Sequence, residues 1–184
     1  MHKTTALFTK YISLLMFAST FSIAGISHAE TPPPAAIPDE EQPVHITADS
    51  LESQEQQGIS IYKGNVLITQ GSLQLNGDII TVNHPDSLVT KVTATGKPAN
   101  FRRYSQVDQA WLTGNATQIE YNAKEKTILL TGEAQVSQPG KHLIKGPKLF
   151  YDIGKQTLLA KGTKEDKGRV SVTFTPAPSE KKEP

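Results

Sequence analysis

The chain is dominated by short stretches in which apolar and polar residues alternate, the pattern of a β-strand with one buried face. The clearest stretch lies between Gly64 and Gly77 and divides at Gly71. Glycine accepts backbone angles that other residues avoid, so we expect two short strands that bend at Gly71. Similar short runs occur at residues 44–46, 59–61, 80–82, 92–94, 99–101, 119–121, 128–130, 149–151, 158–160 and 170–174.

Four glycines recur about 30 to 36 residues apart, at Gly64, Gly96, Gly132 and Gly162. Each follows a short apolar run, so we expect each to end a strand, with roughly four short strands in every interval. A repeat of this length indicates stacked supersecondary units. Short strands joined by tight turns, without crossover helices, pair antiparallel. The pattern therefore predicts an all-β fold, either a closed barrel or a partly open sandwich with unpaired first and last strands.

The chain divides into four parts by composition. Lys3 and Lys10, a mostly apolar run at residues 11–26 and Ser27-His28-Ala29 predict a cleaved signal peptide over residues 1–29. The alternative, an uncleaved membrane anchor, is disfavoured because the apolar run is short and interrupted by serines. Residues 30–42 are rich in proline and predict a solvated leader. Residues 43–175 form the predicted domain, and residues 176–184 a disordered tail.

The charge balance and the cysteine content each exclude one possibility: binding to nucleic acid and stabilisation by disulfide bonds. The chain has 19 basic and 18 acidic residues, and loss of Lys3 and Lys10 with the signal leaves it almost neutral. This balance argues against binding to nucleic acid, which normally shows an excess of basic residues. The absence of cysteine means that strand pairing and apolar burial alone hold the predicted domain together.

The sequence contains no recognisable catalytic, metal-binding or nucleotide-binding motif. His45 alternates out of phase with its apolar neighbours and should face solvent, while His84 lies in a predicted turn. Asp49, Glu52 and Glu55 form the densest acidic group, which we interpret as a solvated surface. We therefore expect no enzymatic activity, no cofactor and no metal site.

One set of apolar residues shares a phase that would place all of its members on a single face. In a purely structural interpretation these residues form a closed sandwich core. The alternative is an apolar groove between two layers that do not fully collapse. The pattern alone does not separate the two. The set comprises Val44, Ile46, Val66, Ile68, Leu73, Leu75, Ile80, Val82, Phe101, Ile119, Tyr121, Ile128, Leu130, Val136, Leu149, Tyr151 and Leu158.

Four stretches, in this order and spacing, resemble the OstA-like family of periplasmic lipopolysaccharide-transport proteins. They are residues 42–46, 64–71, 96–101 and 130–132. The resemblance implies a twisted, slightly open antiparallel β-jellyroll. It also implies a head-to-tail bridge between inner-membrane LptC and outer-membrane LptD, along which the lipid A moiety of lipopolysaccharide moves. Groove-lining positions carried over from the family, with those that follow from alternation, are Val44, Ile46, Val66, Ile68, Leu73, Leu75, Phe101, Ile119 and Tyr121.

The two ends of the predicted sheet lack covering elements, because a proline-rich leader precedes the first strand and a disordered tail follows the last. Unpaired strand edges invite pairing with another chain. We therefore expect self-association through these edges, formed by Val44, His45, Ile46 and Thr47 at one end and Val170, Ser171, Val172, Thr173 and Phe174 at the other.

Two functions of different classes remain in view. The first is a periplasmic lipid carrier. An inner-membrane ATPase would supply the energy for its transport of lipid. The second is a carbohydrate-binding or structural β-sandwich module of the cell envelope, which would display aromatic platforms. Trp111 is the single tryptophan, so the sequence favours the carrier.

Overall fold

The computed structural model describes residues 37–138, 142–162 and 168–175. The predicted signal peptide, the first part of the proline-rich leader and the predicted tail lie outside these residues. The strands are β1 (Val44–Thr47), β2 (Ser50–Gln54), β3 (Ile59–Gln70), β4 (Leu73–Asn83), β5 (Lys91–Ser105), β6 (Ala110–Asn122), β7 (Thr127–Gln138), β8 (His142–Asp152), β9 (Thr157–Lys161) and β10 (Ser171–Phe174). Three single-turn 3-10 helices accompany them: η1 (Asp39–Glu41), η2 (Glu55–Gln57) and η3 (Pro85–Ser87). No helix in the described ranges is long and apolar enough to cross a membrane.

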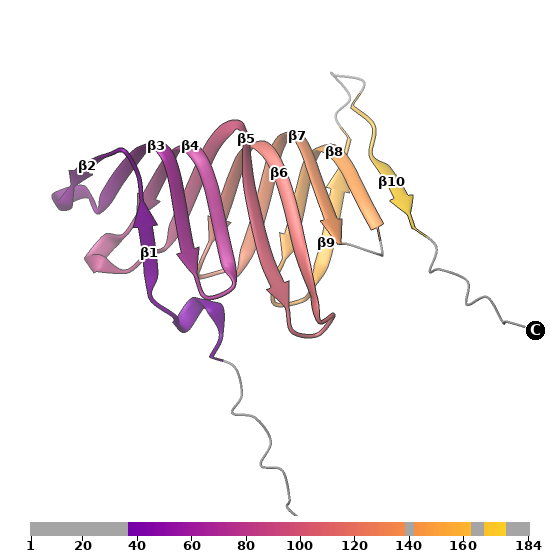
Figure 1. Ribbon diagram of the computed structural model, residues 1–184, viewed down its shortest axis with the longest axis horizontal. Coiled ribbons are helices and arrows are strands. Elements are labelled where there is room, and N and C mark those ends of the chain that lie inside the picture. The colour runs from indigo at the N-terminus through magenta and orange to yellow at the C-terminus, as the bar shows by residue number, and fades with distance from the viewer. Residues whose placement is uncertain (1–36, 139–141, 163–167, 176–184) are drawn as a thin grey trace, which may run out of the picture. The chain divides into compact units, whose positions relative to one another are not determined.

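The ten strands of the described residues belong to one antiparallel sheet in which β3 to β8 follow one another as a meander (Figure 1). The edges are divided between short strands. At one edge, β1 pairs with residues 67–70 of β3, and β2 pairs with residues 59–63 of the same strand. At the other edge, β10 pairs with residues 142–145 of β8, and β9 pairs with residues 148–152. This open, antiparallel all-β arrangement confirms the predicted fold class.

The long strands differ from the short ones predicted by sequence. Each of β3 to β8 passes through an irregularity in register near its middle, which falls between Lys63 and Val66 in β3 and between Thr131 and Ala134 in β7. The expectation that Gly64, Gly96 and Gly132 end strands is therefore wrong, since all three lie inside strands at these irregularities. Gly162 does follow the end of a strand, and the predicted turn at Gly71 is present.

These irregularities divide the sheet into two layers around a common interior. The first layer contains β1, β10 and residues 66–70, 73–76, 99–105, 110–116, 134–138 and 142–146. The second layer contains β2, β9 and residues 59–63, 79–83, 91–95, 118–122, 127–131 and 148–152. Buried residues of both layers form a single cluster. Figure 1 shows the strands winding around this interior.

The bends also keep the apolar face inward in both layers. Side chains alternate between the two faces of a strand, so an inserted residue shifts the phase of alternation. In β4 the buried residues change from Leu73 and Leu75 to Ile80 and Val82, and in β6 from Leu112 and Ala116 to Ile119 and Tyr121. In these two strands the alternation changes phase where the strand bends, which keeps apolar side chains in the interior on either side. In β7 the phase is the same on both sides, from Ile128 and Leu130 to Ala134 and Val136.

A polar contact fixes the bend of β3. Gly64 and Asn65 both have left-handed backbone angles, with φ of 79° and 46°. The backbone N–H of Asp49 donates to the Gly64 carbonyl at 3.0 Å, and Asn65 Nδ2 donates to Asp49 Oδ2 at 2.9 Å. Asp49 is exposed, as expected of a solvated acidic group, but it also holds the bend together.

The stretch from Ser50 to Gln54 forms strand β2, where the sequence analysis predicted a solvated acidic surface and no strand. Its backbone pairs with β3 although most of its side chains are exposed. Ladder hydrogen bonds at an exposed edge require no apolar alternation, so the usual signal of a strand is missing here. Glu52 accompanies Lys63 in an exposed ion pair of 3.4 Å. No group of acidic or histidine side chains in the described part could hold a metal ion.

Candidate functional site: the apolar interior and its rim

The interior gathers every residue of the predicted apolar face. Most of these side chains are fully buried, and Val44, Ile46 and Leu158 are half-buried and pack against the others. Seven of the nine predicted lipid-binding residues are at most 4% exposed: Val66, Ile68, Leu73, Leu75, Phe101, Ile119 and Tyr121. The largest fully buried side chains each contribute about 1.5–3 kcal/mol by leaving water.

Both layers supply lining residues, although the predicted lipid-binding set came mostly from the first. Only Ile119 and Tyr121 of that set belong to the second layer. Sequence reasoning also missed several buried residues, and most of them are small: Val92, Ala94, Ala99, Leu112, Ala116 and Ala134. Alanine carries little signal in an alternating pattern, because it occurs on both faces of sheets.

The two layers are in contact, so the described interior is filled by its own side chains. Ile80, Ile119, Ile128, Leu130 and Leu149 of the second layer are completely buried. The sandwich-core interpretation therefore describes this conformation.

The rim opposite the bends is formed by the turns between strands, and we call it the open rim. Its first-layer side contains the β3–β4 turn at Ser72 and the inward-facing end of β5 at Arg103. Its second-layer side contains the β6–β7 turn at Lys126 and the β8–β9 turn at Gly154. A concavity of about 270 Å³ lies between these groups and residues 37–40.

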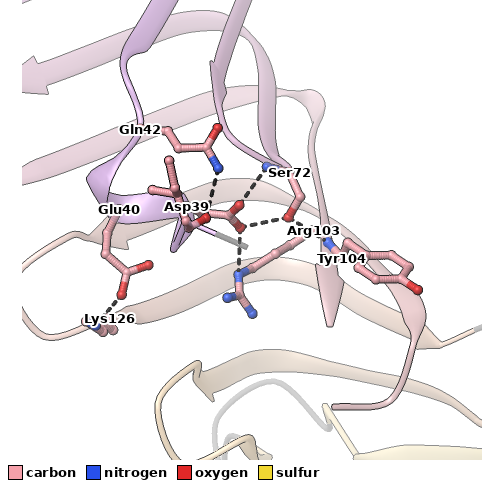
Figure 2. Close-up of polar contacts among 8 residues, drawn as sticks. Asp39, Glu40, Gln42, Ser72, Arg103, Tyr104 and Lys126 are labelled. Atoms are coloured by element: carbon pink, nitrogen blue, oxygen red, sulfur yellow. Dashed lines mark hydrogen bonds and ion pairs between the residues drawn. The ribbon is translucent and has the colours of Figure 1, made fainter. Parts of the chain in front are cut away.

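Helix η1 covers part of the open rim, where Figure 2 shows its polar contacts. Asp39 accepts hydrogen bonds from the backbone N–H of Ser72 at 2.7 Å and from Ser72 Oγ at 2.7 Å. Its Oδ2 also lies 3.3 Å from Nε of Arg103. Glu40 forms an ion pair with Lys126 across the rim. The expectation of a solvated leader is therefore wrong for these last residues, because the Asp39 side chain is only 13% exposed.

The main chain next to η1 is held as well. Gln70, at the end of β3, is buried and its Nε2 donates to the carbonyls of Glu40 and Gln42, each at 3.2 Å. Ser72 Oγ in turn accepts a hydrogen bond from the backbone N–H of Tyr104 at 3.0 Å. A buried polar group without a partner is costly, so these contacts hold η1 against the open rim in this conformation.

Electrostatic effects connect the open rim to the interior. The hydrogen bond from Lys126 lowers the pKa of Glu40. Burial raises the pKa of Tyr121 to about 12, and the neighbouring Glu40 carboxylate adds to this effect while Arg103 opposes it. Burial likewise raises the pKa of Tyr151. The burial of both phenols therefore favours their uncharged form.

The predicted association edges lie at opposite ends of the sheet. Val44, His45, Ile46 and Thr47 form β1, and His45 faces solvent as expected. Ser171, Val172, Thr173 and Phe174 form β10, directly after Val170. Val172 and Phe174 are exposed apolar residues, at 46% and 75%. Sequence reasoning missed that β2 and β9 extend these two edges.

The outer face of the first layer carries the single tryptophan. The guanidinium of Arg102 lies 4.4 Å from the centre of the Trp111 ring, and Tyr104 packs against Trp111 edge to face at 5.5 Å. A cation above the ring leaves less of it for a sugar to stack on. Beside it lies a groove of about 320 Å³ whose lining includes Asn76, Asn100 and Asn115.

The chain is similar to proteins of lipopolysaccharide export. Residues 45–157 match the family model described as LptA/(LptD N-terminal domain) LPS transport protein. Lipopolysaccharide export system protein LptA of Escherichia coli K12 is 33% identical over 174 residues, which cover 92% of this chain and 88% of the relative. LptH of Pseudomonas aeruginosa is 32% identical over 123 residues, covering 66% of this chain and 70% of LptH.

A solved structure supports the same relationship. The crystal structure of LptH from Pseudomonas aeruginosa is described as the LptA-homologous periplasmic component of the lipopolysaccharide transport device. It superimposes with a TM-score of 0.69 at 29% identity and covers 75% of this chain and 99% of that one. The chain therefore belongs to the LptA/LptD N-terminal domain family of lipopolysaccharide-transport proteins.

Proposed function

We propose that this chain is a periplasmic carrier that holds the acyl chains of lipopolysaccharide between the two layers of its sheet. The observation that carries the proposal is the continuous apolar interior, lined by both layers and extending from β1 at one edge to β9 at the other. Each methylene group left in water costs an amphiphile roughly 0.8 kcal/mol. An apolar interior that reaches both ends of the sheet offers a shielded path across an aqueous compartment.

The aliphatic lining suits transport better than tight storage. Aliphatic side chains attract an acyl chain without preferring one position along it, so the lipid can slide. The buried cluster of the described residues consists of aliphatic and aromatic side chains, which offer an acyl chain no charged group to anchor it. Energy for directed movement would come from the inner-membrane transporter.

Both exposed edges favour assembly into a bridge. The backbone groups on the outer side of β1 and β10 have no strand partner in the described sheet. Pairing of β10 in one copy with β1 in the next would extend the sheet and align the interiors. Such a head-to-tail contact joins two different surfaces and therefore produces open filaments. The terminal copies would then meet inner-membrane LptC and outer-membrane LptD, and the signal peptide would direct the chain to the periplasm.

A binding measurement tests the carrier against the carbohydrate-binding alternative. Purified mature protein is titrated with lipid A in detergent, with and without an excess of the free saccharide portion of lipopolysaccharide. The carrier predicts binding of lipid A that the free saccharide does not displace. Displacement by the saccharide, together with binding that depends on Trp111, would instead support a carbohydrate-binding module.

A further inference from the structure

The open rim contains a well-formed anion site that the chain's own leader fills. Two hydrogen-bond donors and a cation converge on the Asp39 carboxylate: the backbone N–H and Oγ of Ser72, both at 2.7 Å, and the Arg103 guanidinium, whose Nε lies at 3.3 Å. Arg103 is itself largely enclosed, with 19% of its side chain exposed. A guanidinium, a hydroxyl and a backbone N–H form a donor set that binds phosphate oxygens as readily as carboxylate oxygens.

A second cation lies across the rim. Lys126 comes from the second layer and is neutralised by Glu40, the residue that follows Asp39. The two adjacent carboxylates of η1 therefore neutralise one cation from each layer and connect the layers at their open side (Figure 2). If η1 moved away, the rim would present two unneutralised cations at the entrance to the apolar interior.

This site lies next to the buried core. Arg103 follows Phe101 along the inner face of β5, and its charge reaches Tyr121 and Tyr151 of the second layer. An anion bound at Ser72 and Arg103 would therefore sit at the rim with the core directly behind it. That is the arrangement required by an amphiphile whose phosphate groups adjoin its acyl chains.

We propose that Ser72, Arg103 and Lys126 form a binding site for the phosphate groups of an acylated amphiphile, and that Asp39 and Glu40 occupy this site as an internal competitor when no lipid is bound. The inference rests on the carrier function proposed above. Loading then exchanges two carboxylates for phosphate groups, and release allows η1 to return. Other charges at this rim are Asp108, which accepts a hydrogen bond from Ser105 at 3.0 Å, and the Asp152–Lys155 pair at 3.1 Å.

The test compares lipid A that carries its phosphates with dephosphorylated lipid A of the same acyl chains, each titrated in the same detergent. Wild type is compared with Asp39→Asn/Glu40→Gln, which weakens the competitor, and with Arg103→Gln/Lys126→Gln, which removes the cations. Glu41→Gln and Lys124→Gln are matched controls, since both residues are exposed neighbours in the same segments. Lys126→Gln alone, on an exposed turn, serves if the double variant fails to fold.

We expect wild type to bind phosphorylated lipid A more tightly than the dephosphorylated form. Neutralising the competitor should raise the affinity for the phosphorylated form about tenfold, removing the cations should lower it by a similar factor, and the dephosphorylated form should change little. The control variants should match wild type. Wild type is also tested with inorganic phosphate alone, which should stabilise the folded protein far less than lipid A does.

Three results would overturn the site. Equal affinity of wild type for both forms of lipid A, or an equal gain for both forms when the competitor is neutralised, would make η1 a steric plug without anion recognition. Equal stabilisation by inorganic phosphate and by lipid A would assign the site to free phosphate. If wild type bound neither form of lipid A, the carrier function itself would be contradicted. This result is distinguishable from the three results above, which concern only the phosphate site.

Discussion

Phe101 of β5 packs over Gly114, its direct partner on β6. A Cβ atom at Gly114 would overlap the Phe101 ring and lie 2.9 Å from the carbonyl oxygen of Gln135. The absence of a side chain at Gly114 is therefore what leaves room for the Phe101 ring beside β6. This pair places an aromatic side chain of the predicted lipid-binding set against a neighbouring backbone.

Substitution of Gly114 should be strongly destabilising. We expect Gly114→Val to lower the free energy of unfolding by about 1–3 kcal/mol, because the added carbons overfill a packed interior. Thermal or urea unfolding followed by circular dichroism measures the change. Gly154→Ala is the control, since a Cβ there meets only Asp152 Oδ1 at 3.5 Å. Equal stability of Gly114→Val and wild type would show that the Phe101 ring does not lie over Gly114.

The bend of β7 gives a second prediction. Gly132 has a φ of 80°, and a Cβ there would lie 2.7 Å from Thr117 Oγ1. Gly132→Ala should cost about 1–3 kcal/mol of stability through backbone strain. Gly146→Ala in β8 is the matched control, because its φ is ordinary and its nearest neighbours lie at 3.5 Å. The stability of both variants is measured by urea unfolding. An equal loss of stability in Gly132→Ala and Gly146→Ala would contradict this prediction.

Titration at alkaline pH reports on the packing of Tyr121. The pKa of this phenol is raised from 10.0 to about 12, so folding favours its neutral form. Its contribution to stability is therefore complete below pH 10 and is lost as the pH rises towards 12, with Tyr151 adding a loss of the same sign. Tyr121→Phe should retain more stability than wild type across this range and lack one late phenolate absorbance step. An unchanged titration curve would place Tyr121 in contact with water.

Removal of β10 should separate assembly from folding. All four of its residues are exposed, so a chain that ends at Arg169 should keep its sheet and nearly the melting temperature of the full chain. We expect light scattering to show rod-like oligomers that grow with concentration for the full chain and a monomer for the shortened one. Deletion of residues 176–184 alone is the control and should leave the oligomers intact. Filaments in the chain without β10 would locate the contact on another surface.

The alternation of apolar residues was sufficient to predict the fold class and the inward face. Val66, Ile68, Ile80 and Val82 are all buried as their phase indicated. Alternation failed in β4 and β6, because a change of phase within a strand looks the same as a turn between strands. In β3 the phase is kept, since Ser60 is buried like Val66 and Ile68, but the apolar Ile59 and Ile61 alternate in the opposite phase and lie outside the core. Residues 59–61 and 66–70 therefore look like separate strands in the sequence, although both belong to β3.

The open rim could not be predicted, because its contacts depend on residues far apart in the sequence. Asp39 meets Ser72 and Arg103, and neither partner is related to it by a local spacing. The only local signal was an acidic triplet after Pro38, which is also common in solvated segments. Strand β2 was missed for a related reason, since its pairing with β3 involves backbone groups that leave no mark on side-chain pattern.

Photo-crosslinking in cells tests the path of the lipid most directly. A photoreactive amino acid is placed at Phe101 or Tyr121, which face the interior, and at the neighbouring residues Arg102 or Glu120, which do not. Each pair shares a strand and a depth along the sheet, so only the direction of the side chain differs. The account predicts a lipopolysaccharide adduct at the two inward positions and none at the two outward positions. Adducts of equal yield on both faces, or on the outward face alone, would contradict transport through the interior.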